Sequence, residues 1–210
     1  MADFKTHTVF GTGAGIGLAA LAAAGNFITL PGAVLAVFLA VTASALPDID
    51  SDIGSPRRFA LSALEISAPA ILMISLPQEF ALENLLLAGI AAFFVIRYPL
   101  NFIINKLTRH RGAWHSVPMA LIAGMSVYLA FYRSEFSGRI VFALIFFLCF
   151  LLHLLLDEIC SLKYFGLALK KSFGTALKFT GSSWRQTVLM YIVIAILGGV
   201  CIFEQLARGK

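Results

Sequence analysis

The sequence predicts an all-α, polytopic membrane protein that forms a single integral membrane domain over residues 1–210. Of its residues, 60% are hydrophobic and only 13% are charged, which leaves too little polar surface to cover a water-soluble domain. The mean hydropathy of +0.90 agrees with this composition. The apolar residues also gather into stretches of about 18–20 residues, the length at which a helix crosses a hydrocarbon core of about 30 Å.

Such stretches predict a bundle of about seven spanning helices. They lie at 8–25, 30–46, 59–76, 80–97, 116–132, 139–157 and 184–203. The run from Gly11 to Gly25 is rich in Gly and Ala, so the first two spans are either closely packed spanning helices or short, re-entrant ones. The segments 99–109 and 158–183 mix apolar and basic side chains, and we expect both to lie as amphipathic segments in the membrane interface.

Positive charge is concentrated on one side of the predicted bundle. Counting spans from the N-terminus places twelve of the 16 Lys and Arg residues on the side where the chain begins. The remaining four are Arg133, Arg139, Arg208 and Lys210. By the positive-inside rule, the N-terminus is therefore cytoplasmic and the C-terminus lies across the membrane.

Candidate metal ligands collect on the same side as the positive charge. They are His7, Asp48, Asp50, His110, His115, His153 and Asp157. Each lies near the start of an odd-numbered span or the end of an even-numbered one, so the predicted topology brings all of them to one face. Imidazole and carboxylate together suit zinc, with manganese or non-haem iron as alternatives, and the set offers ligands for one to three ions.

Two local patterns carry the aspartates. In H-L-L-L-D, His153 and Asp157 are four residues apart and share one face of a helix, so both side chains can reach the same ion. In L-P-D-I-D-S-D, Pro47 ends a helix, and we expect an extended segment from which Asp48 and Asp50 point in opposite directions.

A third pattern, H-R-G-A-W-H-S, carries two histidines. His110 and His115 are five residues apart, too far for one helix face, but Gly112 permits a turn that brings both rings inward. Ser116 can cap the span that follows. Arg111 stands between the two ligand candidates, where a guanidinium is suited to bidentate contact with phosphate oxygens.

The order of these patterns resembles the YdjM-like family of inner-membrane-associated metal-dependent hydrolases. T-H, L-P-D-I-D, H-R-G-x-x-H-S and H-x-x-L-D follow one another over residues 6 to 157. The family's motif residues carry over to His7, Asp48, Asp50, His110, Arg111, Gly112, His115, Ser116, His153 and Asp157. The resemblance implies a location in the bacterial inner membrane. It also implies a distant similarity to zinc-dependent phospholipase C and P1-type nucleases, which cleave phosphate esters.

The sequence therefore favours a metal-dependent hydrolase of a phosphorylated lipid, with Asp52 as general base and Arg111 on the substrate phosphate. The alternative is a divalent metal-ion transporter or sensor, which predicts ligands near the bilayer midplane or on both faces. Glu65, an acid inside the third span, either supports the site and its protons or bonds to a neighbouring helix. The expected partners are the lipid bilayer and the lipid substrate, with no nucleic acid, and the oligomeric state is left open.

Overall fold

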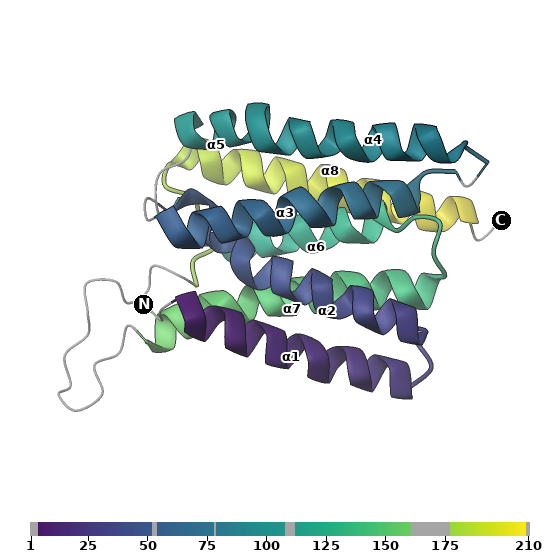
Figure 1. Cartoon of the computed structure of the whole chain (residues 1–210). Coiled ribbons are helices and arrows are strands. Elements are labelled where there is room, and N and C mark those ends of the chain that lie inside the picture. Colours follow the sequence, from purple (N-terminus) through teal and green to yellow (C-terminus); the bar gives the residue numbers. More distant parts are fainter. Residues whose placement is uncertain (1–3, 52–53, 78, 108–111, 161–176, 209–210) are drawn as a thin grey trace.

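The computed structural model describes residues 4–51, 54–77, 79–107, 112–160 and 177–208. The long elements within these ranges are all helices, and they lie side by side along one axis (Figure 1). They are α1 (Phe4–Ala24), α2 (Leu30–Ala45), α3 (Gly54–Ser75), α4 (Leu82–Val95), α5 (Asn101–Leu107), α6 (Val117–Ala130), α7 (Phe136–Ile159) and α8 (Trp184–Arg208). The predicted all-α membrane bundle is confirmed.

Six of the helical segments in the described part of the chain are long and apolar enough to cross a membrane. The exception among the predicted spans is α6, an apolar helix of 14 residues. At about 1.5 Å per residue, α6 is roughly 21 Å long, shorter than a hydrocarbon core of about 30 Å. Large apolar side chains cover the outside of the bundle, including Leu21, Leu87 and Phe203. Such a surface suits contact with lipid and is rarely exposed to water by soluble proteins.

The glycine-rich first helix packs closely along the second. α1 extends over 21 residues and is not a short re-entrant segment. A Cβ atom added at Gly11 would overlap Ser44, and one added at Gly15 would overlap Ala40. The small residues therefore allow the backbones of α1 and α2 to approach, as expected for helices that associate in lipid.

The segment after α4 stays helical and continues in α5. A π-helical turn at Ile96–Leu100 links α4 directly to α5. Pro99 lies inside this turn, and because proline lacks an amide hydrogen, it interrupts the regular α-helical hydrogen bonds at this point. The predicted interfacial segment 99–109 is thus helical as far as Leu107, and its location in the interface stays a prediction. Most of the other such segment, 158–183, lies outside the described residues, which resume at Leu177.

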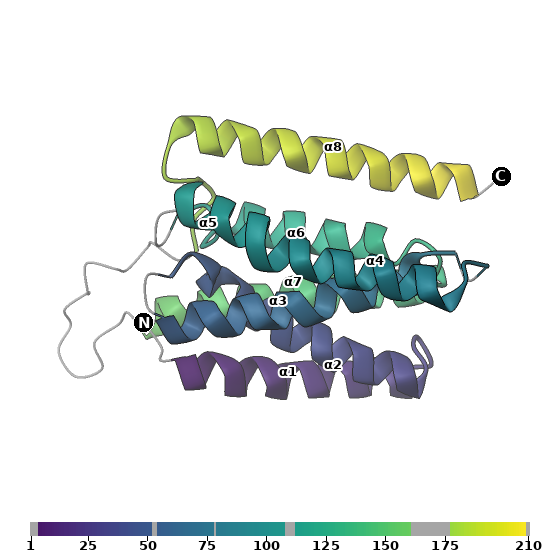
Figure 2. The ribbon, with the colours of Figure 1, turned by 45° about the horizontal axis from the view of Figure 1, so that its top comes forward.

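The helix α8 stands at the edge of the bundle and packs mainly on α6 (Figure 2). One polar cluster attaches it to α7. Arg139 on α7 is fully buried and donates to both carboxylate oxygens of Glu204 on α8, at 2.8 and 2.6 Å. The same guanidinium lies 4.0 Å from the ring centroid of Tyr128 on α6. Arg139 therefore ties three helices together, in addition to any effect on membrane orientation.

Candidate metal centre

Four segments far apart in sequence bring candidate ligands to one end of the bundle. His7 lies near the start of α1, Asp48 in a 3₁₀ turn after α2, and His115 in the loop before α6. His153 and Asp157 lie near the C-terminal end of α7. All of these helix ends are at the end of the bundle where α1 begins (Figure 1). The five residues are buried, with exposed fractions between 0% and 7%.

The backbone that carries the aspartates after α2 has a different conformation from the predicted one. Residues Leu46–Asp50 form a 3₁₀ helix that follows α2 without a break, so the predicted extended segment is wrong. Pro47 is compatible with this conformation because it stands in the first turn, where its missing amide hydrogen is not needed. With about three residues per turn, Asp48 and Asp50 still point in different directions. They consequently meet different partners.

Three imidazole nitrogens and two carboxylates face one small volume. His115 Nε2 is 3.9 Å from Asp48 Oδ1 and 3.8 Å from Asp157 Oδ2. His153 Nε2 is 3.8 Å from the same Asp48 oxygen. His7 Nε2 is 3.2 Å from Asp157 Oδ1, and its ring stacks on that of His153 with centroids 3.8 Å apart. The contacts join residues from α1, the 3₁₀ turn, the loop before α6 and α7.

Protein oxygens lie beside the outer nitrogens of two of these histidines, at hydrogen-bond distance for His153 and somewhat farther for His115. His153 Nδ1 lies 2.6 Å from the carbonyl oxygen of Ser44. A carbonyl only accepts, so Nδ1 carries the proton and Nε2 keeps its lone pair. His115 Nδ1 lies 3.5 Å from Asp50 Oδ1, while Asp50 Oδ2 accepts from the amide of Gly112 at 3.1 Å. Both rings therefore direct Nε2 inward, as metal-binding histidines do when a second residue fixes the ring.

Some buried polar atoms here lack a hydrogen-bond partner among the residues that the structure describes. They include His7 Nδ1, Asp50 Oδ1, His153 Nε2 and Asp157 Oδ2. Such an atom costs about 1–3 kcal/mol when it is buried without a partner, and folded proteins contain few of them. A cation between His153 Nε2 and Asp157 Oδ2 would satisfy both inward-facing atoms.

The spacing of the potential ligand atoms fits a metal ion. His7, His153 and Asp157 form one group, and Asp48, His115 and His153 form another, each with ligand atoms within 4.8 Å of one another. Ligands about 2.0–2.2 Å from a tetrahedral zinc ion lie roughly 3.3–3.6 Å apart. The contacts of 3.2, 3.8 and 3.9 Å between His and Asp atoms are close to that range. These buried His and Asp groups could therefore hold a metal ion.

Asp52, His110 and Arg111 lie outside the described residues. Glu65 on α3 pairs with Arg97 after α4, with 3.1 Å between Oε2 and Nη1, so it bonds to a neighbouring helix. Ser116 caps α6 as predicted, because its hydroxyl accepts from the amide of Met119.

One contributor was missed by the sequence reasoning. The backbone carbonyl of Ser44 fixes the ring of His153. Any residue type has such a carbonyl, so the amino acid at position 44 does not indicate this contact. A usable signal was its position: the last four carbonyls of a helix have no partner within the helix, and Ser44 is the penultimate residue of α2.

Comparison with known proteins agrees with this description. A family model described as YdjM inner membrane protein matches residues 1–207, which includes every candidate ligand. No curated protein and no solved structure matched the chain. The match confirms the resemblance seen in the four motifs and the location in the inner membrane. The chain belongs to the YdjM inner membrane protein family.

Proposed function

We propose that this protein is a metal-dependent hydrolase that cleaves the phosphate ester of a membrane lipid at the cytoplasmic face. The observation that carries the proposal is the convergence of His153 Nε2, His115 Nε2 and Asp48 Oδ1 within a buried cluster. A purely structural polar cluster would pair its buried atoms with one another. Here His153 Nε2 and Asp157 Oδ2 have no hydrogen-bond partner in the described part of the chain.

The metal ligands in this proposal share an inward-facing nitrogen or oxygen. They are His7, Asp48, His115, His153 and Asp157. His153 belongs to both ligand groups, and it has only Nε2 to offer an ion because Nδ1 is bonded to the carbonyl of Ser44. The described residues thus favour one shared ion, and His110 is a candidate ligand for a further one. Zinc suits the donor set best, with manganese or iron as alternatives.

Asp50 has a different role in this proposal, as a positioning residue. Its carboxylate lies behind His115, toward Nδ1, and is anchored by the amide of Gly112. A carboxylate in that place orients the ring and increases the basicity of the ligating nitrogen.

The chain itself supplies a base and a cation for phosphoester hydrolysis. A bound divalent ion would polarise a phosphoryl oxygen and make water more acidic. Asp52 accepts a proton from the attacking water as its oxygen bonds to phosphorus. The ester P–O bond breaks, and the leaving alkoxide oxygen takes the proton that Asp52 received from water, so that the alcohol departs and Asp52 is again a carboxylate. Arg111 binds the phosphate oxygens in a bidentate manner, where its fixed charge offsets the negative charge of the transition state.

The location of the site supports a lipid substrate. Four of the five ligands, all except His115, lie near the ends of helical segments that are long enough to span the membrane, and the sequence predicts most of the positive charge on the same side. A phosphorylated headgroup in the bilayer surface is within reach of such a site without leaving the membrane. Ligands gathered at one end of the bundle are also not the pattern expected for a transporter, which binds its ion near the midplane.

The test measures metal and catalysis in one preparation. Purified protein, loaded with zinc in nanodiscs, is expected to hold about one zinc per chain and to release phosphate from phosphatidic acid or an alcohol from a phosphodiester lipid. Asp157→Asn should lose both properties. Glu83→Gln is the matched control, since it removes an exposed carboxylate at the start of α4, away from the centre.

Three outcomes contradict the proposal. The first is wild-type protein that binds no metal after exposure to zinc. The second is Asp157→Asn protein with unchanged metal content. The third is zinc flux into proteoliposomes without release of phosphate or alcohol from any phospholipid class, because this result would identify a transporter.

A further inference from the structure

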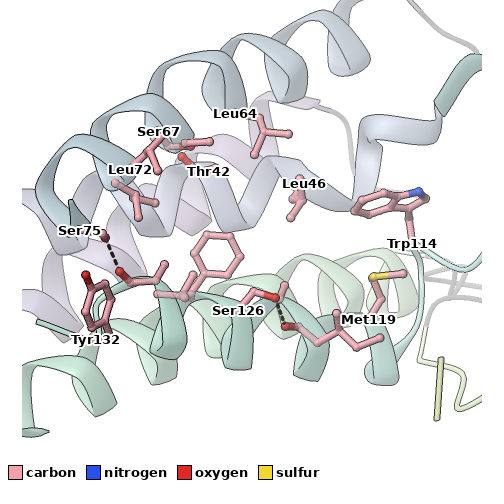
Figure 3. A pocket seen from close by; sticks show the side chains of 17 residues that line it. Thr42, Leu46, Leu64, Ser67, Leu72, Ser75, Trp114, Met119, Ser126 and Tyr132 are labelled. Carbon is pink, nitrogen blue, oxygen red and sulfur yellow. Dashed lines mark hydrogen bonds between the residues drawn. The ribbon is translucent and has the colours of Figure 1, made fainter. Parts of the chain in front are cut away.

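A long apolar groove runs along the bundle beside the metal centre. It lies between α3 and α6, has α2 and α7 as its floor, and encloses about 530 Å³ (Figure 3). Trp114 and Leu46 lie at one end, and Tyr132 and Ser75 at the other (Figure 3). Ser126 on its wall is exposed, so the groove is open at the side of the bundle. Its volume falls in the range of about 300–1,000 Å³ typical of small-molecule sites.

Three of the five hydroxyl groups that line this groove donate to backbone carbonyls. Thr42 donates to the carbonyl of Phe38 at 3.0 Å, and Ser126 donates to that of Ile122 at 2.8 Å. Ser75 donates to the carbonyl of Ala130 across the end of the groove. These three hydroxyl hydrogens are therefore occupied, and the lining is otherwise mostly hydrocarbon, such as Leu72 and Val127. Such walls favour an alkyl chain over water or a polar ligand.

One end of the groove adjoins the metal centre through the chain itself. Leu46 begins the 3₁₀ turn that carries Asp48, and Trp114 immediately precedes His115. Along α6, the lining extends from Met119 to Ala130, which at about 1.5 Å per residue is roughly 17 Å. One leaflet of a bilayer has a hydrocarbon thickness of about 15 Å, half of about 30 Å. The groove thus matches a single lipid chain in length and begins where the headgroup would be processed.

We propose that this groove holds one hydrocarbon chain of the phosphorylated lipid substrate, with the headgroup at the metal centre. The inference rests on the proposed hydrolase function and adds to it a selectivity for chain length. Tyr132 and Ser75 close the end remote from the metal centre, so a chain longer than the groove has to bend outward there. A chain that enters the groove exchanges bilayer hydrocarbon for walls of similar polarity, so its binding depends on how well it fits the groove in length and shape.

Binding is measured by the fluorescence of Trp114, independently of catalysis. The chain has two tryptophans, and the Trp184→Phe variant removes the other one, which is exposed at the start of α8. The probe is monoacyl phosphatidic acid with a dibrominated chain, added to metal-free protein in nanodiscs of unbrominated phosphatidylcholine. Bromine quenches only a nearby indole. We expect saturable quenching that excess unbrominated monoacyl phosphatidic acid reverses.

Two groove-filling variants and one matched control identify the groove as the binding site. Ala123→Phe on α6 and Ala68→Phe on α3 place a ring in the groove from opposite walls. The added ring occupies space that the chain would fill, so each variant should lose the saturable quenching at probe concentrations that saturate wild type. Ala91→Phe makes the same substitution at an exposed position on α4 outside the groove and should leave binding unchanged. Thermal denaturation in detergent confirms that each variant is folded, and either groove variant suffices for the comparison.

The outcomes separate this inference from the proposed function. Quenching that rises linearly with bromolipid content, and equally in both groove variants and the control, overturns the inference, because ordinary bilayer lipid would then account for it. Phosphate release that does not depend on chain length, together with unsaturable quenching, keeps the hydrolase and overturns the groove. Saturable quenching lost in the groove variants, with no hydrolysis by the zinc-loaded protein, keeps the groove and overturns the hydrolase.

Discussion

Substitution of Asp50 by asparagine should weaken metal binding without unfolding the protein. Asparagine has nearly the same shape, and its carbonyl oxygen can still accept from the amide of Gly112, as Asp50 Oδ2 does at 3.1 Å. Its amide group would then face His115 Nδ1, where the carboxylate oxygen lies at 3.5 Å. A donor in that place favours the tautomer with the proton on Nε2, which removes the lone pair that the ion needs.

The expected loss follows from the position of Asp50 behind the ligand. Residues that orient a metal-binding histidine typically contribute about 10–100-fold in metal affinity, or about 1.4–2.7 kcal/mol. Loss of a direct ligand, as in Asp157→Asn, should be larger. Zinc affinity measured by competition with a chromophoric chelator gives both values on one scale, and thermal denaturation of the metal-free proteins checks that the fold is retained.

Two results would refute the reasoning. Zinc affinity equal to wild type in Asp50→Asn would show that the carboxylate does not orient His115. A loss as large as that of Asp157→Asn would make Asp50 a ligand in its own right, as the sequence alone suggested. An intermediate loss, partly recovered in Asp50→Glu, agrees with the positioning role.

Other predictions concern packing, helix attachment and topology. Gly15→Leu should separate α1 from α2 and lower both thermal stability and zinc content, whereas Gly13→Leu, whose added Cβ meets no atom within 4 Å in the described structure, should change neither. Glu204→Ala leaves a buried guanidinium without its carboxylate, so we expect about 3 kcal/mol of destabilisation in detergent unfolding, with zinc content unchanged. In a background without native cysteines, Lys5→Cys and Arg208→Cys should be labelled from opposite sides of sealed vesicles. Labelling of both positions from the same side would contradict the odd number of spans.

The approach of His7 to Asp157 was predictable from hydropathy and span parity. Those properties require only that each apolar stretch crosses the membrane once, and they place both residues at the same end of the bundle. The close packing of α1 on α2 followed in the same way from its glycines, once a full-length helix was assumed. The types of residue and their order along the chain were therefore enough to predict the His7–Asp157 contact and the packing of α1 on α2.

Features that depend on local backbone geometry were not predictable in this way. Pro47 permits either an extended segment or the first turn of a 3₁₀ helix, and only packing against the bundle selects the second. The segment 99–109 was expected to lie in the interface after the fourth span, but a π-helical turn that contains Pro99 joins α4 and α5 into one continuous helical segment. The bidentate pair of Arg139 with Glu204 joins residues 65 positions apart, and charge counting assigned its arginine only to membrane orientation.

The sequence separation between His7 and Asp157 has a consequence for how the protein is made. These residues are 150 positions apart, and their contact joins the first helix to the end of α7. During synthesis, α1 enters the membrane long before the segment that carries Asp157 leaves the ribosome, so the complete ligand set cannot exist in any early intermediate. Any metal uptake at this centre would therefore be a late event in biogenesis. It would lock α1 onto α7 after insertion, and a chain truncated before α7 would be left with an unsecured first helix, open to membrane proteases.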